Sequence, residues 1–145
     1  MSHLLDVNFL VALFDARHVN HDAAHRWFGA TGAADWATCP ITETGCVRVL
    51  SNPAYPTVSA SPREALRRLA RFCDSAGHRF WPDDLSLRDS LDDATAGRLQ
   101  GHHQLTDFHL AALAARRRGR LVTFDGRLRR SLDGTPLAPA VLLVE

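Results

Sequence analysis

The sequence contains no lysine, and this absence narrows the chemistry that the chain can perform. All 17 basic residues are arginine, against 16 acidic residues, so the formal net charge at pH 7 is only +1. A chain so close to neutrality is not attracted to nucleic acid by its net charge. Phosphate chemistry that depends on an active-site lysine is excluded.

Cysteines are few, and long apolar runs are lacking. Cys39, Cys46 and Cys73 are odd in number and show no CxxC spacing, which argues against a disulfide framework and a structural zinc site and predicts small buried thiols. The apolar run at 7–14 is too short to span a bilayer, and the N-terminus lacks the basic region of a signal peptide. We expect a cytoplasmic protein without membrane association.

What is present is typical of one globular domain covering residues 1–145, with 46% hydrophobic and 23% charged residues. Short apolar segments alternate with stretches of helical periodicity, which is typical of βαβ units. We therefore predict an α/β fold with a parallel sheet of about 4–5 strands, flanked by helices on both faces. The expected strands are 3–6, 35–38, 78–81, 121–124 and 140–144; the expected helices are 7–15, 20–30, 40–51, 62–75, 85–99, 107–118 and 126–132.

Four acidic residues occupy similar places in this pattern. Asp6 and Asp125 each follow an expected strand, and Asp107 begins an expected helix. Glu43 lies one turn into its helix, and all four share a helical stripe with apolar residues. A helix cap would explain each aspartate separately, because a carboxylate at a helix start accepts backbone N–H bonds. Glu43 lies past the cap position and resists that explanation.

If the four acids converge, their repulsion must be relieved by protons or by a cation. Oxygen-only ligands favour Mg²⁺ or Mn²⁺ over zinc. Such an ion supports hydrolysis of a phosphodiester bond. Asn8 and Thr123 lie two residues from Asp6 and Asp125, where they would supply supporting hydrogen bonds.

Four segments carry a resemblance to a known family: LLDVNFLVALFD, CPITETGCVRVL, HHQLTDFHLAALA and LVTFDGRL. In this order and spacing they resemble the acidic motifs of PIN-domain proteins, and more closely those of VapC-type toxins of bacterial toxin–antitoxin systems. The resemblance implies a Mg²⁺- or Mn²⁺-dependent endoribonuclease with Asp6, Glu43, Asp107 and Asp125 as catalytic metal ligands. It also implies RNA as substrate, neutralisation by a VapB-type antitoxin and a homodimer.

Other functions are less well matched. A haloacid-dehalogenase-like phosphatase needs a second aspartate where Asn8 stands and usually a lysine, and a receiver domain also needs the lysine. A catalytically silent PIN-like module that binds RNA or a protein is the remaining alternative, against which the intact set of four acids argues.

Arginines and histidines gather near the acidic motifs. Seven arginines lie within 116–130, and we name Arg116, Arg117, Arg120 and Arg127 as candidate RNA contacts, with codon bias as the alternative explanation. His21 and His25 have metal-ligand spacing, although an exposed helix face explains them more simply. His102, His103 and His109 flank Asp107, and we expect exposed loop histidines there, with RNA contact as the alternative.

Overall fold

The computed structural model describes all residues 1–145. The chain forms one parallel sheet. The strand order is β3-β2-β1-β4-β5, and every neighbouring pair is parallel. The strands are β1 (His3–Leu5), β2 (Trp36–Thr38), β3 (His78–Phe80), β4 (Arg120–Thr123) and β5 (Val141–Leu143). The order changes direction between β1 and β4, so the carboxyl ends of these two strands form a topological switch point, the usual ligand site in such sheets.

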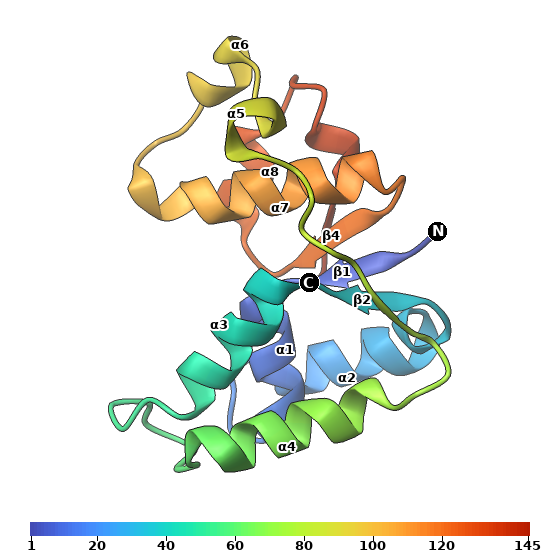
Figure 1. Ribbon diagram of the computed structural model, residues 1–145, viewed down its shortest axis with the longest axis vertical. Helices are drawn as coiled ribbons and strands as arrows, with labels where there is room; N and C mark the ends of the chain where they lie inside the picture. The colour runs from blue at the N-terminus through green and yellow to red at the C-terminus, as the bar shows by residue number, and fades with distance from the viewer.

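Helices cover both faces of the sheet, as predicted (Figure 1). The first four lie on one side of it and the others on the opposite side. They are α1 (Val7–Phe14), α2 (His21–Ala30), α3 (Pro40–Leu50), α4 (Pro62–Cys73), α5 (Leu87–Ser90), α6 (Asp93–Ala96), α7 (Leu105–Arg116) and α8 (Gly126–Ser131), with short 3₁₀ turns at Gly32–Ala34, His102–Gln104 and Ala138–Ala140.

The alternation of side chains along the strands builds two apolar cores. Leu4 and Leu121 point into the core beneath α7 and α8, whereas Leu5 and Val122 point into the core beneath α1 to α4. All four side chains are fully buried. Two covered faces explain why the central strands β1 and β4 carry consecutive apolar residues, whereas the edge strand β3 is mostly polar and largely exposed.

A buried aspartate anchors the proline-rich loop between α3 and α4. Asp15, at the end of α1, accepts hydrogen bonds from the hydroxyls of Tyr55 (2.6 Å) and Thr57 and from the backbone N–H of Arg17 at 2.9 Å. Burial raises the pKa of Asp15, but the hydrogen bonds from Thr57 and Tyr55 outweigh it and hold this pKa below its ordinary value. The loop is therefore tied to the helical layer at a fixed point.

The structure departs from the expected elements in two places. The stretch 85–99 does not form one helix but contains the two four-residue helices α5 and α6. The side chain of Ser86 caps α5, and that of Asp92 caps α6. The helix expected from residue 107 begins earlier, at Leu105. None of the helices has the length and apolar character needed to cross a membrane.

Candidate active site

Asp6 lies at the switch point, between the end of β1 and the start of α1. Its backbone N–H donates to the carbonyl of Val122 in the neighbouring β4 at 3.2 Å, which holds the residue at the sheet edge. Its carboxylate caps α1 by accepting from the N–H of Phe9 at 2.7 Å. Only 5% of Asp6 is exposed. The capping role considered for Asp6 is therefore real, but the cap bond uses only part of the hydrogen-bonding capacity of a buried carboxylate.

Asp125 holds the equivalent place after β4. It caps α8 by accepting from the N–H groups of Arg127 (2.9 Å) and Leu128 (3.3 Å). Its own N–H donates to the hydroxyl oxygen of Thr123 at 3.0 Å. Thr123 is fully buried and also hydrogen-bonds Asp6, so one threonine connects the two strand ends.

Asp107 reaches the same region from α7 and is not a helix cap. The position before α7 belongs to Gln104, which makes no side-chain capping bond, and Asp107 stands in the first turn. The capping explanation therefore fails for this residue.

The three aspartates act on one another electrostatically. Burial raises the pKa of Asp6 to about 7, with the charges of Asp107 and Asp125 adding to the rise and hydrogen bonds from Thr123 and Phe9 opposing it. Burial and the charge of Asp125 raise the pKa of Asp107 to about 6. Two carboxyl groups with raised pKa values thus lie within electrostatic reach of a third aspartate, Asp125, the setting in which a divalent cation binds.

A polar hollow of about 340 Å³ opens onto two of these aspartates. Asp107, Asp125 and Arg127 form part of its wall, and no apolar side chain lines it. The rest of the wall comes from the segment before α7, namely Gln100, Gly101, His103 and Gln104. Such a wall suits a charged, hydrated ligand better than an apolar one.

Glu43 lies in the first turn of α3, but its carboxylate does not join the aspartates. It accepts a hydrogen bond from the hydroxyl of Thr38, the last residue of β2, at 2.6 Å. It also lies close to Cys73 and His78. The structure therefore brings together three of the four predicted acids and directs the fourth toward the neighbouring strand ends.

The close packing of α3 on α1, which sets the position of Glu43, depends on a glycine. A Cβ added at Gly45 would lie 2.5 Å from Cγ2 of Val7, closer than side chains tolerate. Gly45→Ala is expected to lower the free energy of unfolding by about 1–3 kcal/mol, because a stiff β-branched side chain must move. Thermal unfolding measures this, with Gly29→Ala as control, since a Cβ at Gly29 meets nothing within 4 Å. Equal stability of both variants would show that α3 can shift freely.

The supporting and RNA-contact residues are spread more widely. Asn8 is exposed on α1, and its side chain makes no hydrogen bond. Arg127 lines the polar hollow. Arg116 ends α7 and Arg117 follows it, about 14 and 15 Å along the helix axis from Asp107, and both face Asp84 (3.9 and 3.4 Å). Arg120 begins β4, at the opposite end of that strand from Asp125.

The histidines have structural partners that the sequence did not reveal. His21 and His25 donate to the carbonyl oxygens of Ala12 (2.7 Å) and Leu13 (3.0 Å) at the C-terminal end of α1, while His25 stays exposed and His21 half-buried. His109 was expected in an exposed loop, but it is buried in α7 with Nε2 2.9 Å from Asp83. His103 alone of the three near Asp107 lines the polar hollow.

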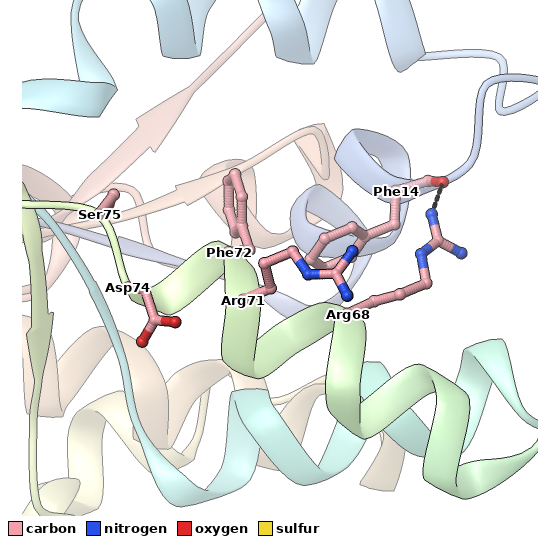
Figure 2. Close-up of a pocket in the computed structure, with 6 residues that line it drawn as sticks. All are labelled: Phe14, Arg68, Arg71, Phe72, Asp74 and Ser75. Atoms are coloured by element: carbon pink, nitrogen blue, oxygen red, sulfur yellow. Dashed lines mark hydrogen bonds between the residues drawn. The ribbon is translucent and has the colours of Figure 1, made fainter.

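A larger hollow of about 570 Å³ lies elsewhere, between α1 and α4 (Figure 2). It is lined by Phe14, Arg68, Arg71, Phe72, Asp74 and Ser75, and none of the four predicted acids contributes to it. Arg68 is already engaged there, donating to the carbonyl of Phe14 at 2.7 Å and lying over its ring. The larger of these two hollows is therefore not the one that contains the carboxylates.

Comparison with known proteins identifies the family of the chain. The family model of the PIN domain matches residues 3–131. This chain belongs to the PIN-domain family. Its curated relatives are of the VapC type: Ribonuclease VapC39 of Mycobacterium tuberculosis is 50% identical over 132 residues, which cover 90% of this chain and 94% of the relative. Ribonuclease VapC38 of the same organism is 44% identical over 140 residues, covering 97% and 96%.

A solved structure supports the PIN fold. Mycobacterium tuberculosis VapC20, described as a toxin that cleaves the sarcin-ricin loop, superposes with a TM-score of 0.63 and covers 89% of this chain and 94% of its own. The two sequences are 16% identical, so the likeness concerns the fold. The predicted fold class and the VapC-type resemblance are both confirmed.

Proposed function

We propose that this VapC-type PIN protein is the toxin of a toxin–antitoxin system and an endoribonuclease that hydrolyses RNA phosphodiester bonds with Mg²⁺ or Mn²⁺. The observation that carries the proposal is the group Asp6, Asp107 and Asp125, whose burial and mutual repulsion raise two carboxyl pKa values toward neutrality. The ribonuclease names of relatives at 50% and 44% identity support the reaction class.

The donor set fits the ion. All three groups offer carboxylate oxygen, the ligand type of Mg²⁺ and Mn²⁺, and their charges repel until a cation is bound. Asp6, Asp107 and Asp125 would hold it, and Glu43 would join by rotating its side chain from Thr38. When bound, the ion lowers the pKa of a coordinated water and stabilises charge on the attacked phosphate.

The chain's own residues have separate roles in this proposal. Thr123 orients Asp6 and Asp125 through its hydrogen bonds, and the backbone caps hold both carboxylates at the sheet edge. The polar hollow admits the RNA backbone, with Arg127 placed to contact a phosphate. Arg116, Arg117 and Arg120 remain predicted contacts for RNA that extends beyond the hollow.

Two assemblies complete the proposal. A VapB-type antitoxin would neutralise the toxin by covering the polar hollow, and the toxin would form a homodimer. Expression of the chain alone should arrest growth, and coexpression of its antitoxin should restore it. Light scattering of the purified chain would measure the dimer, and a monomer at micromolar concentration would contradict that part.

Removing metal tests the enzyme directly. Purified protein is expected to cleave single-stranded RNA with Mg²⁺ or Mn²⁺, to lose cleavage in EDTA and to regain it when Mg²⁺ is restored. Gel analysis of labelled RNA measures this, with Asp107→Asn protein prepared in parallel to detect contaminating nuclease. Tight RNA binding that ignores EDTA and gives no product would favour the silent binding module.

Arg127→Ala is expected to weaken RNA binding about threefold to tenfold and to reduce the slope of log affinity against log salt by about one, because one phosphate contact is lost. Arg129→Ala is the matched control, since Arg129 is exposed on the same helix α8 but does not line the hollow. Binding measured by fluorescence anisotropy at several salt concentrations separates the two. Equal losses in both variants would mean that the helix contributes only diffuse charge.

A further inference from the structure

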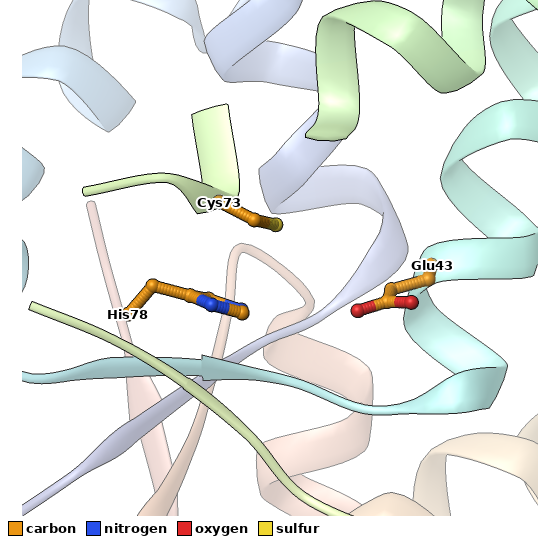
Figure 3. Close-up of side chains that lie close together, drawn as sticks. All are labelled: Glu43, Cys73 and His78. Carbon is orange, nitrogen blue, oxygen red and sulfur yellow. The ribbon is translucent and has the colours of Figure 1, made fainter. Parts of the chain in front are cut away.

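Two further metal-ligating side chains, Cys73 and His78, lie close to Glu43 and have no role in the proposed reaction. Glu43 from α3, Cys73 from the end of α4 and His78 from the start of β3 point toward one another (Figure 3). One ligand atom from each lies within 4.8 Å of the other two, and all three residues are half-buried. Residues from three separate segments meet here.

The donor set differs in kind from the aspartate group. One sulfur, one imidazole nitrogen and one carboxylate oxygen suit Zn²⁺ and similar borderline cations and do not suit Mg²⁺. Tetrahedral zinc bonds of about 2.0–2.3 Å place ligand atoms about 3.4 Å apart. Side-chain rotations that move the ligand atoms by about 1 Å would therefore close the group around an ion. Three protein ligands leave a fourth position for water.

Thr38 holds two of the three ligands in place. Its hydroxyl donates to Oε2 of Glu43 at 2.6 Å and lies 2.8 Å from Nε2 of His78. Thr38 is fully buried at the end of β2, so it provides a fixed hydrogen-bonding point for both side chains. Ligands in metal sites are commonly oriented by such outer hydrogen bonds, which reduces the entropy lost on binding.

The protonation states set the conditions for binding. Burial lowers the pKa of His78, which keeps a ring lone pair free at neutral pH. Burial, and then the charge of Glu43, raises the pKa of Cys73 to about 11. A metal ion must therefore displace the thiol proton, which passes to water, and affinity should increase with pH.

We propose that Glu43, Cys73 and His78 bind one Zn²⁺-like cation, and that the bound cation inhibits the enzyme by withholding Glu43 from the aspartate group. The binding half stands on the geometry of the three side chains alone. The inhibitory half rests on the proposed function, because the same carboxylate cannot serve both groups at once.

Cobalt binding tests the site without RNA. Reduced protein titrated with Co²⁺ is expected to show a thiolate-to-cobalt charge-transfer band that saturates at one equivalent and disappears when Zn²⁺ is added. Cys73→Ser should abolish the band, and His78→Ala should weaken Co²⁺ binding at least about tenfold. Cys46→Ser is the control, because Cys46 is a fully buried thiol of α3 outside the group. The cobalt band of the Cys46→Ser protein should persist. No band in the native protein, or a band that survives Cys73→Ser, would overturn the site.

Inhibition is tested with RNA at saturating Mg²⁺. Zn²⁺ is expected to inhibit the native protein, and Cys73→Ser should keep its Mg²⁺-dependent activity while needing at least about tenfold more Zn²⁺ for half-inhibition. Equal inhibition of both proteins would place Zn²⁺ at the aspartates and overturn the inhibitory half. A protein that cleaves no RNA in any metal would contradict the proposed function, while the cobalt spectrum still decides the site.

Discussion

Replacing Asp107 with asparagine is expected to reduce RNA cleavage at least about 100-fold without unfolding the protein. The carboxylate stands in the first turn of α7, caps nothing and lines the polar hollow, so its charge serves no structural bond. Losing one carboxylate ligand should remove about 3 kcal/mol of transition-state stabilisation. Initial cleavage rates at saturating Mg²⁺, with thermal unfolding of the same samples, measure both effects.

Asp22→Asn provides the matched control for this variant. Asp22 is also a first-turn aspartate, on α2, and it is exposed away from the hollow. It should retain native cleavage. If Asp107→Asn cleaved RNA at a native rate, the aspartate group would lose its proposed role; if it unfolded, Asp107→Glu would separate a structural from a metal-binding role.

The fold was accessible from the sequence because its signals are local. Apolar runs between Gly and Pro positions located all the strands to within two residues, and the buried strands showed the continuous apolar character of a covered parallel sheet. The prediction of one helix over 85–99 was wrong, because four-residue helices bury too little surface to leave a periodic pattern in the sequence. The anchoring of the proline-rich loop by Asp15 also escaped, since its partners Tyr55 and Thr57 are distant in sequence.

Only part of the candidate site could be predicted from the sequence. Asp6 and Asp125 follow strands, so sheet topology alone places them at one edge. The direction of Glu43 depends on Thr38 and His78, whose approach is set by the pairing of β2 with β3. The odd number and spacing of cysteines argued against a zinc site, yet Cys73 meets a histidine from the next strand. Spacing rules look for pairs of cysteines, whereas this group joins one cysteine to a histidine five residues later and to Glu43 from the earlier helix α3.

Asp6→Asn is expected to stabilise the metal-free protein, increasingly so as the pH rises. The pKa of Asp6 is about 7 in the folded state and near 3.8 when unfolded, so between these values the folded state holds a proton that the unfolded state releases. Stability of the native protein therefore falls from about pH 4 to pH 7 and levels off above. Asparagine does not titrate and can still cap α1. At pH 7.5 the variant should gain on the order of 3 kcal/mol in free energy of unfolding.

Urea unfolding in EDTA from pH 4.5 to 8 measures the difference in free energy of unfolding between Asp6→Asn and the native protein. The same series in Mg²⁺ should reduce this difference, because the metal stabilises only the protein that has all three carboxylates. Asp92→Asn is the control: Asp92 caps α6 by accepting from the N–H of Thr95 at 2.7 Å, and hydrogen bonds with Thr95 lower its pKa, so its titration falls below this range. Its curve should run parallel to that of the native protein. Parallel curves for Asp6→Asn as well would mean that the buried carboxylate is already neutralised by a partner other than a proton or a metal, and the case for a cation at this sheet edge would fail.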